Sequence, residues 1–183
     1  MVKIIAVGAS TGGNVAMRHI LTHLSASFTA PILYLNSHHP AEPAWLAQDS
    51  ALPAQWVKDC EALAAQRLYV CPAGFFCRVE ANDTIKLIPT DVSDDGQPRI
   101  DPFFESVAVH YGSDASAVVL SGKSADGAAG VLALRAKLGK VLVQDPASAL
   151  HPELPSAALA TGAVDHVLSV GAIAPFLSQL LRS

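Results

Sequence analysis

The sequence predicts a doubly wound α/β fold, in which a mostly parallel sheet carries helices on both faces and an antiparallel hairpin. Strand-like runs of β-branched residues alternate with segments of helical periodicity along most of the chain. Connections between parallel strands are right-handed crossovers, which place helices on both faces of a sheet. Only 15% of the residues are charged, against about 25% in typical domains, as a covered sheet requires. The 183 residues suit one large core, so we expect a single domain over residues 1–183.

The elements can be assigned in order along the chain. Apolar and β-branched runs that indicate strands cover residues 2–7, 31–35, 117–120, 140–143 and 166–170. Apolar residues at helical spacing cover residues 13–24, the stretch around Trp45 and Leu46, and residues 127–138. Residues 76–80 and 84–89 alternate apolar and polar side chains around a turn-forming Ala-Asn-Asp triplet, which predicts the hairpin as an antiparallel extension. Residues 91–98 (DVSDDGQP) have no apolar period and predict a surface loop.

Composition excludes several classes of protein. The net charge of −4 gives no electrostatic basis for binding nucleic acid or anionic lipid. No apolar run is long enough for a membrane span or a signal peptide, so we expect a cytoplasmic protein that does not insert into membranes. Cys60, Cys71 and Cys77 form no paired motif, and we therefore expect reduced thiols and neither disulfides nor a thiolate zinc site.

Three glycines surround Ser10 in the turn Gly8-Ala-Ser-Thr-Gly-Gly13, between the first strand and the first helix. A turn this tight presents its apex side chain above the carboxyl end of the strand, and the following helix offers amide donors to an oxyanion. Ser10 is therefore a candidate nucleophile. The same geometry cradles dinucleotide phosphates, and a serine at this position also caps helices, so the turn alone leaves three interpretations open. A nicotinamide site needs an acidic residue after the second strand, where this chain has Asn36-Ser37-His38-His39 instead.

Two further residues follow neighbouring strands of the predicted sheet. His38 comes just after the second strand and is a candidate general base for Ser10, although a loop histidine is more often a solvated residue. A His-His pair also suggests metal, but no third ligand lies at a recognisable spacing. Asp126 follows the strand at residues 117–120, where an aspartate either caps the next helix or orients an imidazole. A Ser, a His and an Asp at three strand ends favour a catalytic triad.

Together these segments resemble the catalytic domain of the chemotaxis response-regulator protein-glutamate methylesterases. The Gly-Ala-Ser-Thr-Gly-Gly turn of that family is matched residue for residue by residues 8–13, and its His-x-Pro by His38 and Pro40. Its Gly-x-Gly-Asn-Asp-Gly-Ala segment is matched in part by Gly122 and residues 126–128. Further similar segments are RLYVCP at 67–72, VQDPAS at 143–148 and GAVDHV at 162–167. The resemblance therefore extends over nearly the whole chain.

The resemblance implies a serine hydrolase that removes methyl groups from glutamate γ-methyl esters on the cytoplasmic domain of methyl-accepting chemoreceptors. It assigns Ser10 as nucleophile, His38 as general base and Asp126 as the residue that orients His38. Thr11, Gly12 and Lys123 would line the oxyanion and substrate pocket. It implies no metal and no organic cofactor.

The chain also departs from the pattern of the family. Lys123, Ser124 and Ala125 replace the residues that usually precede the aspartate, which alters the rim of the expected site. Two alternatives therefore stay open: a related hydrolase with a different ester or amide substrate, and a non-catalytic binding module of the same fold. Full-length members usually carry an N-terminal receiver domain, and we expect none in these 183 residues.

Overall fold

The computed structural model describes residues 3–90 and 99–182, and within them a seven-stranded sheet forms the centre of the molecule. Every pair of neighbouring strands in this sheet is parallel. From edge to edge the strands are β10 (His166–Leu168), β9 (Lys140–Gln144), β8 (Ala115–Val119), β1 (Ile4–Ala9), β2 (Ile32–Asn36), β5 (Leu68–Val70) and β3 (Ala54–Trp56).

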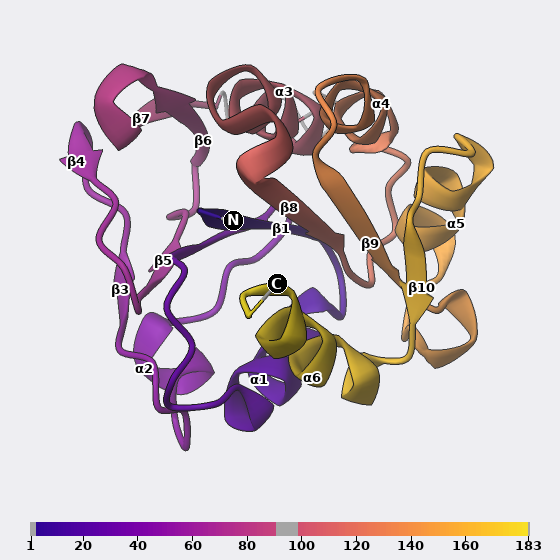
Figure 1. The fold of residues 1–183 in the computed structure, drawn as a ribbon, viewed down its shortest axis with the longest axis horizontal. Helices are drawn as coiled ribbons and strands as arrows, with labels where there is room; N and C mark the ends of the chain where they lie inside the picture. Colours follow the sequence, from indigo (N-terminus) through magenta and orange to yellow (C-terminus); the bar gives the residue numbers. More distant parts are fainter. Residues whose placement is uncertain (1–2, 91–98, 183) are drawn as a thin grey trace.

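Helices cover both faces of the sheet (Figure 1). One face carries α1 (Gly13–His23), α2 (Pro43–Leu46) and α6 (Val170–Leu180). The other carries α3 (Ile100–Tyr111), α4 (Ala128–Ala136) and α5 (Glu153–Ala160). Side chains of β1 alternate between the two cores, because successive residues of a strand point to opposite faces. The arrangement confirms the predicted doubly wound α/β fold.

A small second sheet lies beside α3. Its strands are β4 (Glu61–Ala62), β7 (Thr84–Pro89) and β6 (Phe75–Glu80), in that order, and both pairs are antiparallel. The short turn η1 (Ala81–Asp83) joins β6 to β7, which confirms the predicted hairpin. The hairpin belongs to this separate sheet and does not extend the main one. Residues 91–98, for which the sequence predicts a loop, lie outside the described residues.

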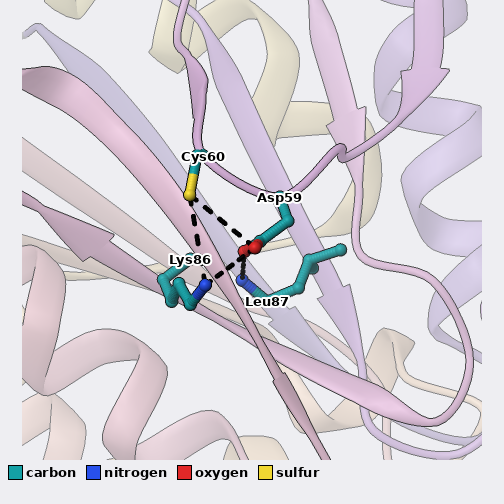
Figure 2. Close-up of polar contacts among 4 residues, drawn as sticks. All are labelled: Asp59, Cys60, Lys86 and Leu87. Carbon is teal, nitrogen blue, oxygen red and sulfur yellow. Dashed lines mark hydrogen bonds and ion pairs between the residues drawn. The ribbon is translucent and has the colours of Figure 1, made fainter.

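Asp59 ties the segment before β4 to strand β7 (Figure 2). Its carboxylate accepts a hydrogen bond from the Lys86 Nζ at 2.7 Å and another from the Leu87 backbone N–H at 2.9 Å. These two bonds lower the pKa of the Asp59 carboxyl. Cys60 lies beside this pair, and all three cysteines of the chain are free thiols. These contacts tie the segment that leads into β4 to the central strand of the small sheet.

The order of the strands defines where a site is expected. The chain runs outward from β1 through β2 towards β3, then returns to β8 on the other side of β1 and continues through β9 to β10. In doubly wound sheets ligands bind at the carboxyl ends of the strands on either side of such a reversal. Ser10, the loop after β2 and the loop after β8 all lie at this position. Within the described residues, no helix is long and apolar enough to span a membrane.

The remaining short elements are the single turns η2 (Gly112–Asp114) and η3 (Pro146–Ser148). The sequence pattern predicts no helix at the positions of three described helices, α3, α5 and α6. Strands β3 and β4 were likewise not expected, because runs of three and two residues are too short to show an apolar period.

Candidate active site

The Ser10 turn is fixed from both sides. The Ser10 N–H donates to the Ser121 carbonyl at 3.0 Å, and the Gly13 N–H donates to the Ser10 carbonyl at 2.9 Å. Gly12 precedes α1 with a φ of 83°, a left-handed conformation that glycine adopts without strain. The Ser10 residue is 6% exposed. The turn therefore holds Ser10 in a buried position at the switch point of the sheet.

The segment after β8 lies directly against this turn. A Cβ atom on Gly122 would lie only 2.7 Å from the Ser10 Cβ, so this close approach requires a glycine. The Ser121 hydroxyl donates to the Thr11 carbonyl at 3.0 Å and accepts from the His151 N–H at 2.9 Å. Lys123, the next residue after Gly122, is exposed at the rim. Three of the residues singled out from the sequence, Ser10, Thr11 and Lys123, are thus brought close together.

Unpaired backbone donors occur at this junction. In the described part of the chain, the N–H groups of Thr11, Gly12 and Lys123 have no hydrogen-bond partner. Free amides next to a serine are the donors that an oxyanion requires. The Gly122 N–H is not available for this, because it donates to the His151 carbonyl at 3.0 Å.

Asn36 joins the loop of His38 to the Ser10 turn. Its side-chain Nδ2 donates to the Ser10 carbonyl at 3.1 Å. Its Oδ1 accepts from the backbone N–H groups of His38 and His39 at 3.0 and 3.1 Å. Asn36 is 7% exposed, so these bonds are shielded from water. No motif in the sequence indicates this role for Asn36, which stands where a nicotinamide site would need a carboxylate.

A buried polar network supports Asn36. Its Nδ2 also lies within 3.1 Å of the Asn14 Oδ1 and the Tyr34 hydroxyl. The Tyr34 hydroxyl donates to the Asn14 Oδ1 at 2.8 Å, and the Asn14 Nδ2 donates to the His39 carbonyl at 2.7 Å. Burial raises the pKa of Tyr34 far above its ordinary value, so its hydroxyl remains a donor. The network fixes the loop after β2 against α1.

The His38 side chain is exposed and its ring packs against that of His39, with centroids 4.1 Å apart. Among the residues that the structure describes, no hydrogen bond joins the His38 ring to Ser10 or to Asp126. The described ranges also contain no cluster of three or more His, Cys, Asp or Glu side chains suited to a metal ion. His38 therefore lies on the loop that Asn36 joins to the Ser10 turn, and its ring has no hydrogen-bond partner in the described part of the chain.

Asp126 caps a helix. Its Oδ2 accepts from the N–H groups of Arg99 and Ile100 at 2.7 and 2.8 Å, and its Oδ1 accepts from that of Asp101 at 2.9 Å. These are orphan donors at the start of α3. Burial raises the pKa of the Asp126 carboxyl, and the three backbone bonds oppose that rise. Asp126 is thus a helix cap, as one interpretation of the sequence predicts, but the helix that it caps is α3. The helix that follows Asp126 in the sequence, α4, is instead preceded by Gly127.

Arg99 connects this cap to the loop of His38. Its guanidinium Nη1 donates to the Ser37 carbonyl at 3.0 Å. Arg99 lies in none of the motifs that the sequence analysis used, so no signal in the sequence pointed to it. Together, Asn36 and Arg99 hold the peptide group between Ser37 and His38.

A cavity of about 240 Å³ opens next to the turn. Gly12 and Ser121 line it on the side of the turn, and Val15 and Leu150 add apolar walls. Val15 and Leu150 are 66% and 70% exposed, which places apolar surface beside the serine. The site thus combines a buried serine, free amides, a neighbouring histidine and an adjacent apolar hollow, an arrangement suited to nucleophilic attack on a carbonyl group.

Comparisons with known proteins give matches over nearly the whole chain. A family model described as CheB methylesterase matches residues 5–177. A protein-glutamate methylesterase/protein-glutamine glutaminase of Anaeromyxobacter dehalogenans is 37% identical over 186 residues, which cover 98% of this chain and 54% of that protein. A protein of the same name from Hahella chejuensis is 34% identical over 181 residues, covering 97% and 52% of the two chains. The chain spans about half the length of the curated relatives it matches.

A solved structure matches over the whole fold. The crystal structure of the CheB methylesterase catalytic domain of Thermotoga maritima superposes with a TM-score of 0.88 at 26% identity. The match covers 98% of this chain and 99% of that domain. The similarity therefore covers nearly the whole of both chains.

Proposed function

This chain belongs to the CheB methylesterase family, and we propose that it hydrolyses glutamate γ-methyl esters on the cytoplasmic domain of methyl-accepting chemoreceptors, with release of methanol. The observation that carries the proposal is the Ser10 turn, in which a buried serine contacts Gly122 and lies among free backbone amides. The names of the relatives support the substrate class. We further propose that the chain acts in the cytoplasm.

The proposed reaction has two steps. The Ser10 hydroxyl attacks the ester carbonyl while His38 accepts its proton, and the resulting oxyanion accepts hydrogen bonds from the N–H groups of Thr11 and Lys123. His38 then returns the proton to the departing methoxide, which leaves as methanol. Water, deprotonated by His38, then attacks the acyl-enzyme, and the bond to Ser10 breaks as His38 returns this proton to the departing Ser10 oxygen; the product is a free glutamate side chain. Every proton is thus moved by the chain's own residues.

The exposed ring of His38 is compatible with this role. Catalytic hydrogen bonds are often long or absent in a free enzyme and tighten only when substrate binds. Asn36 fixes the backbone of both segments, and in the proposed mechanism rotation of the His38 side chain brings its ring to Ser10. Asp126, whose carboxylate accepts hydrogen bonds from the start of α3, would support His38.

A second candidate reaction uses the same groups. The names of the relatives pair methylesterase with protein-glutamine glutaminase. Attack of Ser10 on a glutamine side-chain amide would give the same acyl-enzyme, with ammonia in place of methanol as the leaving group. We therefore propose receptor glutamine deamidation as an accompanying activity, measured as ammonia release.

The test is methanol release from methylated chemoreceptor by the wild-type chain, by Ser10→Ala and by Ser178→Ala. Ser178 lies on α6 away from the site, so its loss controls for the removal of a hydroxyl group. We expect release from the wild-type chain and from Ser178→Ala, and background release from Ser10→Ala. Ser10-dependent hydrolysis of aryl esters without methanol release would instead favour a different substrate. A folded wild-type chain inactive on both would favour a binding module.

A further inference from the structure

Arg99 bridges two loops that flank the Ser10 turn. Its backbone N–H donates to the Asp126 Oδ2 at 2.7 Å, and its guanidinium Nη1 donates to the Ser37 carbonyl at 3.0 Å. We propose that Arg99 is a positioning residue that holds the backbone of His38 in place for the reaction. This inference rests on the proposed function, because it assigns His38 the role of general base.

The contacts of Asp126 fix the backbone from which the Arg99 side chain extends. Both of its oxygens accept hydrogen bonds from backbone N–H groups at the start of α3, and within the described residues neither oxygen contacts the His38 ring. The carboxylate thus fixes the first turn of α3, and with it the backbone of Arg99. From there the Arg99 side chain reaches a carbonyl that lies 62 residues earlier in the sequence.

The bond to the Ser37 carbonyl acts on the peptide group that leads into His38. Asn36 holds the N–H of that peptide group at 3.0 Å, and Arg99 holds its carbonyl oxygen. Both hydrogen-bonding atoms of the peptide unit are therefore occupied by side chains from different elements. Without Arg99, only the bond from Asn36 would restrain the plane of this peptide and the direction of the His38 Cα–Cβ bond.

The environment of the guanidinium favours this role over simple stabilisation. Arg99 is partly buried, and in the portions of the chain that are described it forms no ion pair with a carboxylate. The polar contact of its side chain is therefore the hydrogen bond to the Ser37 carbonyl. The helix cap uses only the backbone of Arg99, so substitutions of the side chain leave the bond to Asp126 available.

The experiment compares Arg99→Met with Arg99→Lys, using methyl-ester hydrolysis on receptor and aryl-ester hydrolysis as separate assays. Methionine keeps an unbranched stem but has no donor, whereas lysine keeps a donor for the Ser37 carbonyl. We expect kcat of Arg99→Met to fall by about 10- to 100-fold with KM nearly unchanged, because misplacement by about 1 Å costs up to about 100-fold in rate. Arg99→Lys should recover most of the loss. Arg78→Ala, which removes a charge from the exposed face of β6, should behave as wild type.

Three outcomes would overturn the inference: wild-type kcat in Arg99→Met, a rise in KM alone, or a loss that Arg99→Lys does not restore at all. If Arg99→Met does not fold, Arg99→Ala replaces it with the same expected loss. The rate of Ser10 labelling by an organophosphorus serine reagent provides a readout that requires no ester substrate. If the wild-type chain hydrolyses aryl esters through Ser10 but does not hydrolyse receptor esters, the proposed substrate is contradicted. The positioning role of Arg99 is then tested by the aryl-ester assay alone. A wild-type chain that neither hydrolyses esters nor reacts with the serine reagent at Ser10 would overturn both the proposed function and the inference on Arg99.

Discussion

The side-chain amide of Asn36 donates a hydrogen bond to the carbonyl oxygen of Ser10 at 3.1 Å. The same side chain accepts from the backbone N–H of His38, so a single buried residue sets the distance between the two loops that carry the proposed nucleophile and base. A strand end is well suited to this task, because β2 pairs with β1 in parallel register up to Ala9 and Asn36.

We expect Asn36→Ala to lower kcat by about 10- to 100-fold, because the loop of His38 would shift relative to Ser10. The free energy of unfolding should fall by about 1–3 kcal/mol, since the Ser10 carbonyl and two N–H groups lose a partner. Urea unfolding and ester hydrolysis measure the two effects. Asn36→Asp is the informative comparison: it keeps an acceptor for the His38 N–H but has no donor for Ser10. Wild-type kcat in Asn36→Ala would contradict the linking role.

A second expectation concerns the close approach of Gly122 to the nucleophile. The Cβ of Gly122→Ala would lie 2.7 Å from the Ser10 Cβ and 3.1 Å from the Ser10 nitrogen. The turn must therefore move, and we expect activity to fall by at least about 10-fold, with a loss of about 1–3 kcal/mol in stability. Gly171→Ala on α6 is the matched control, because the nearest atom to its new Cβ would be 3.7 Å away. Equal activity in the two variants would show that the contact is not critical.

The sequence predicts where the candidate site lies, but not the contacts within it. Ser10, His38 and Asp126 were selected because each follows a strand, and the parallel sheet does bring these three strand ends together. The bonds made by Asn36 and Arg99 were not predictable, since they join residues 26 and 62 positions apart and use common polar side chains outside any motif. Such contacts depend on the final packing of loops, which periodicity does not encode.

The helices missed from the sequence have a shared physical cause. Each of α3, α5 and α6 contains a proline, namely Pro102, Pro155 and Pro175. A proline argues against a helix in a sequence pattern, because it lacks a backbone N–H. In the first turn of a helix, however, that N–H would have no intrahelical partner, so no hydrogen bond is lost. Pro102 and Pro155 lie in the first turns of α3 and α5, where they are tolerated. Pro175 lies inside α6, where packing of Ile173 and Leu177 into the core supports the helix.

Two buried serines should respond to truncation in opposite directions. The hydroxyl of Ser116, on β8, is fully buried and has no hydrogen-bond partner among the described residues. Ser116→Ala removes this unpaired group, and we expect the free energy of unfolding to rise by about 1 kcal/mol. The Ser106 hydroxyl donates to the Phe103 carbonyl at 2.7 Å and accepts from the Val79 N–H at 3.0 Å. Ser106→Ala should therefore lower stability by about 1–3 kcal/mol. A loss in both variants would contradict the assignment of Ser116 as unpaired.

The carboxyl of Asp126 should make stability depend on pH in an unusual direction for an aspartate. Burial raises its pKa in the folded protein above the value near 3.9 that an unfolded chain has, despite three backbone hydrogen bonds. The folded state then binds the proton more tightly than the unfolded state. The contribution of this group is therefore most favourable below the unfolded pKa and declines as pH rises through the folded pKa. An aspartate stabilised as its anion would behave in the opposite way.

Asp126→Asn isolates this effect, because its side-chain oxygen still accepts from the start of α3 but does not titrate in this range. We expect the stability of the wild-type chain relative to Asp126→Asn to fall as pH rises from about 4 and to become constant once the carboxyl is fully ionised. Urea unfolding of both proteins between about pH 4 and pH 7 measures the difference directly. A difference that grows in favour of the wild-type chain with rising pH would mean that the three N–H bonds outweigh burial. Asp126 would then be held as a stabilised anion at the start of α3, available to act on charge that develops at His38.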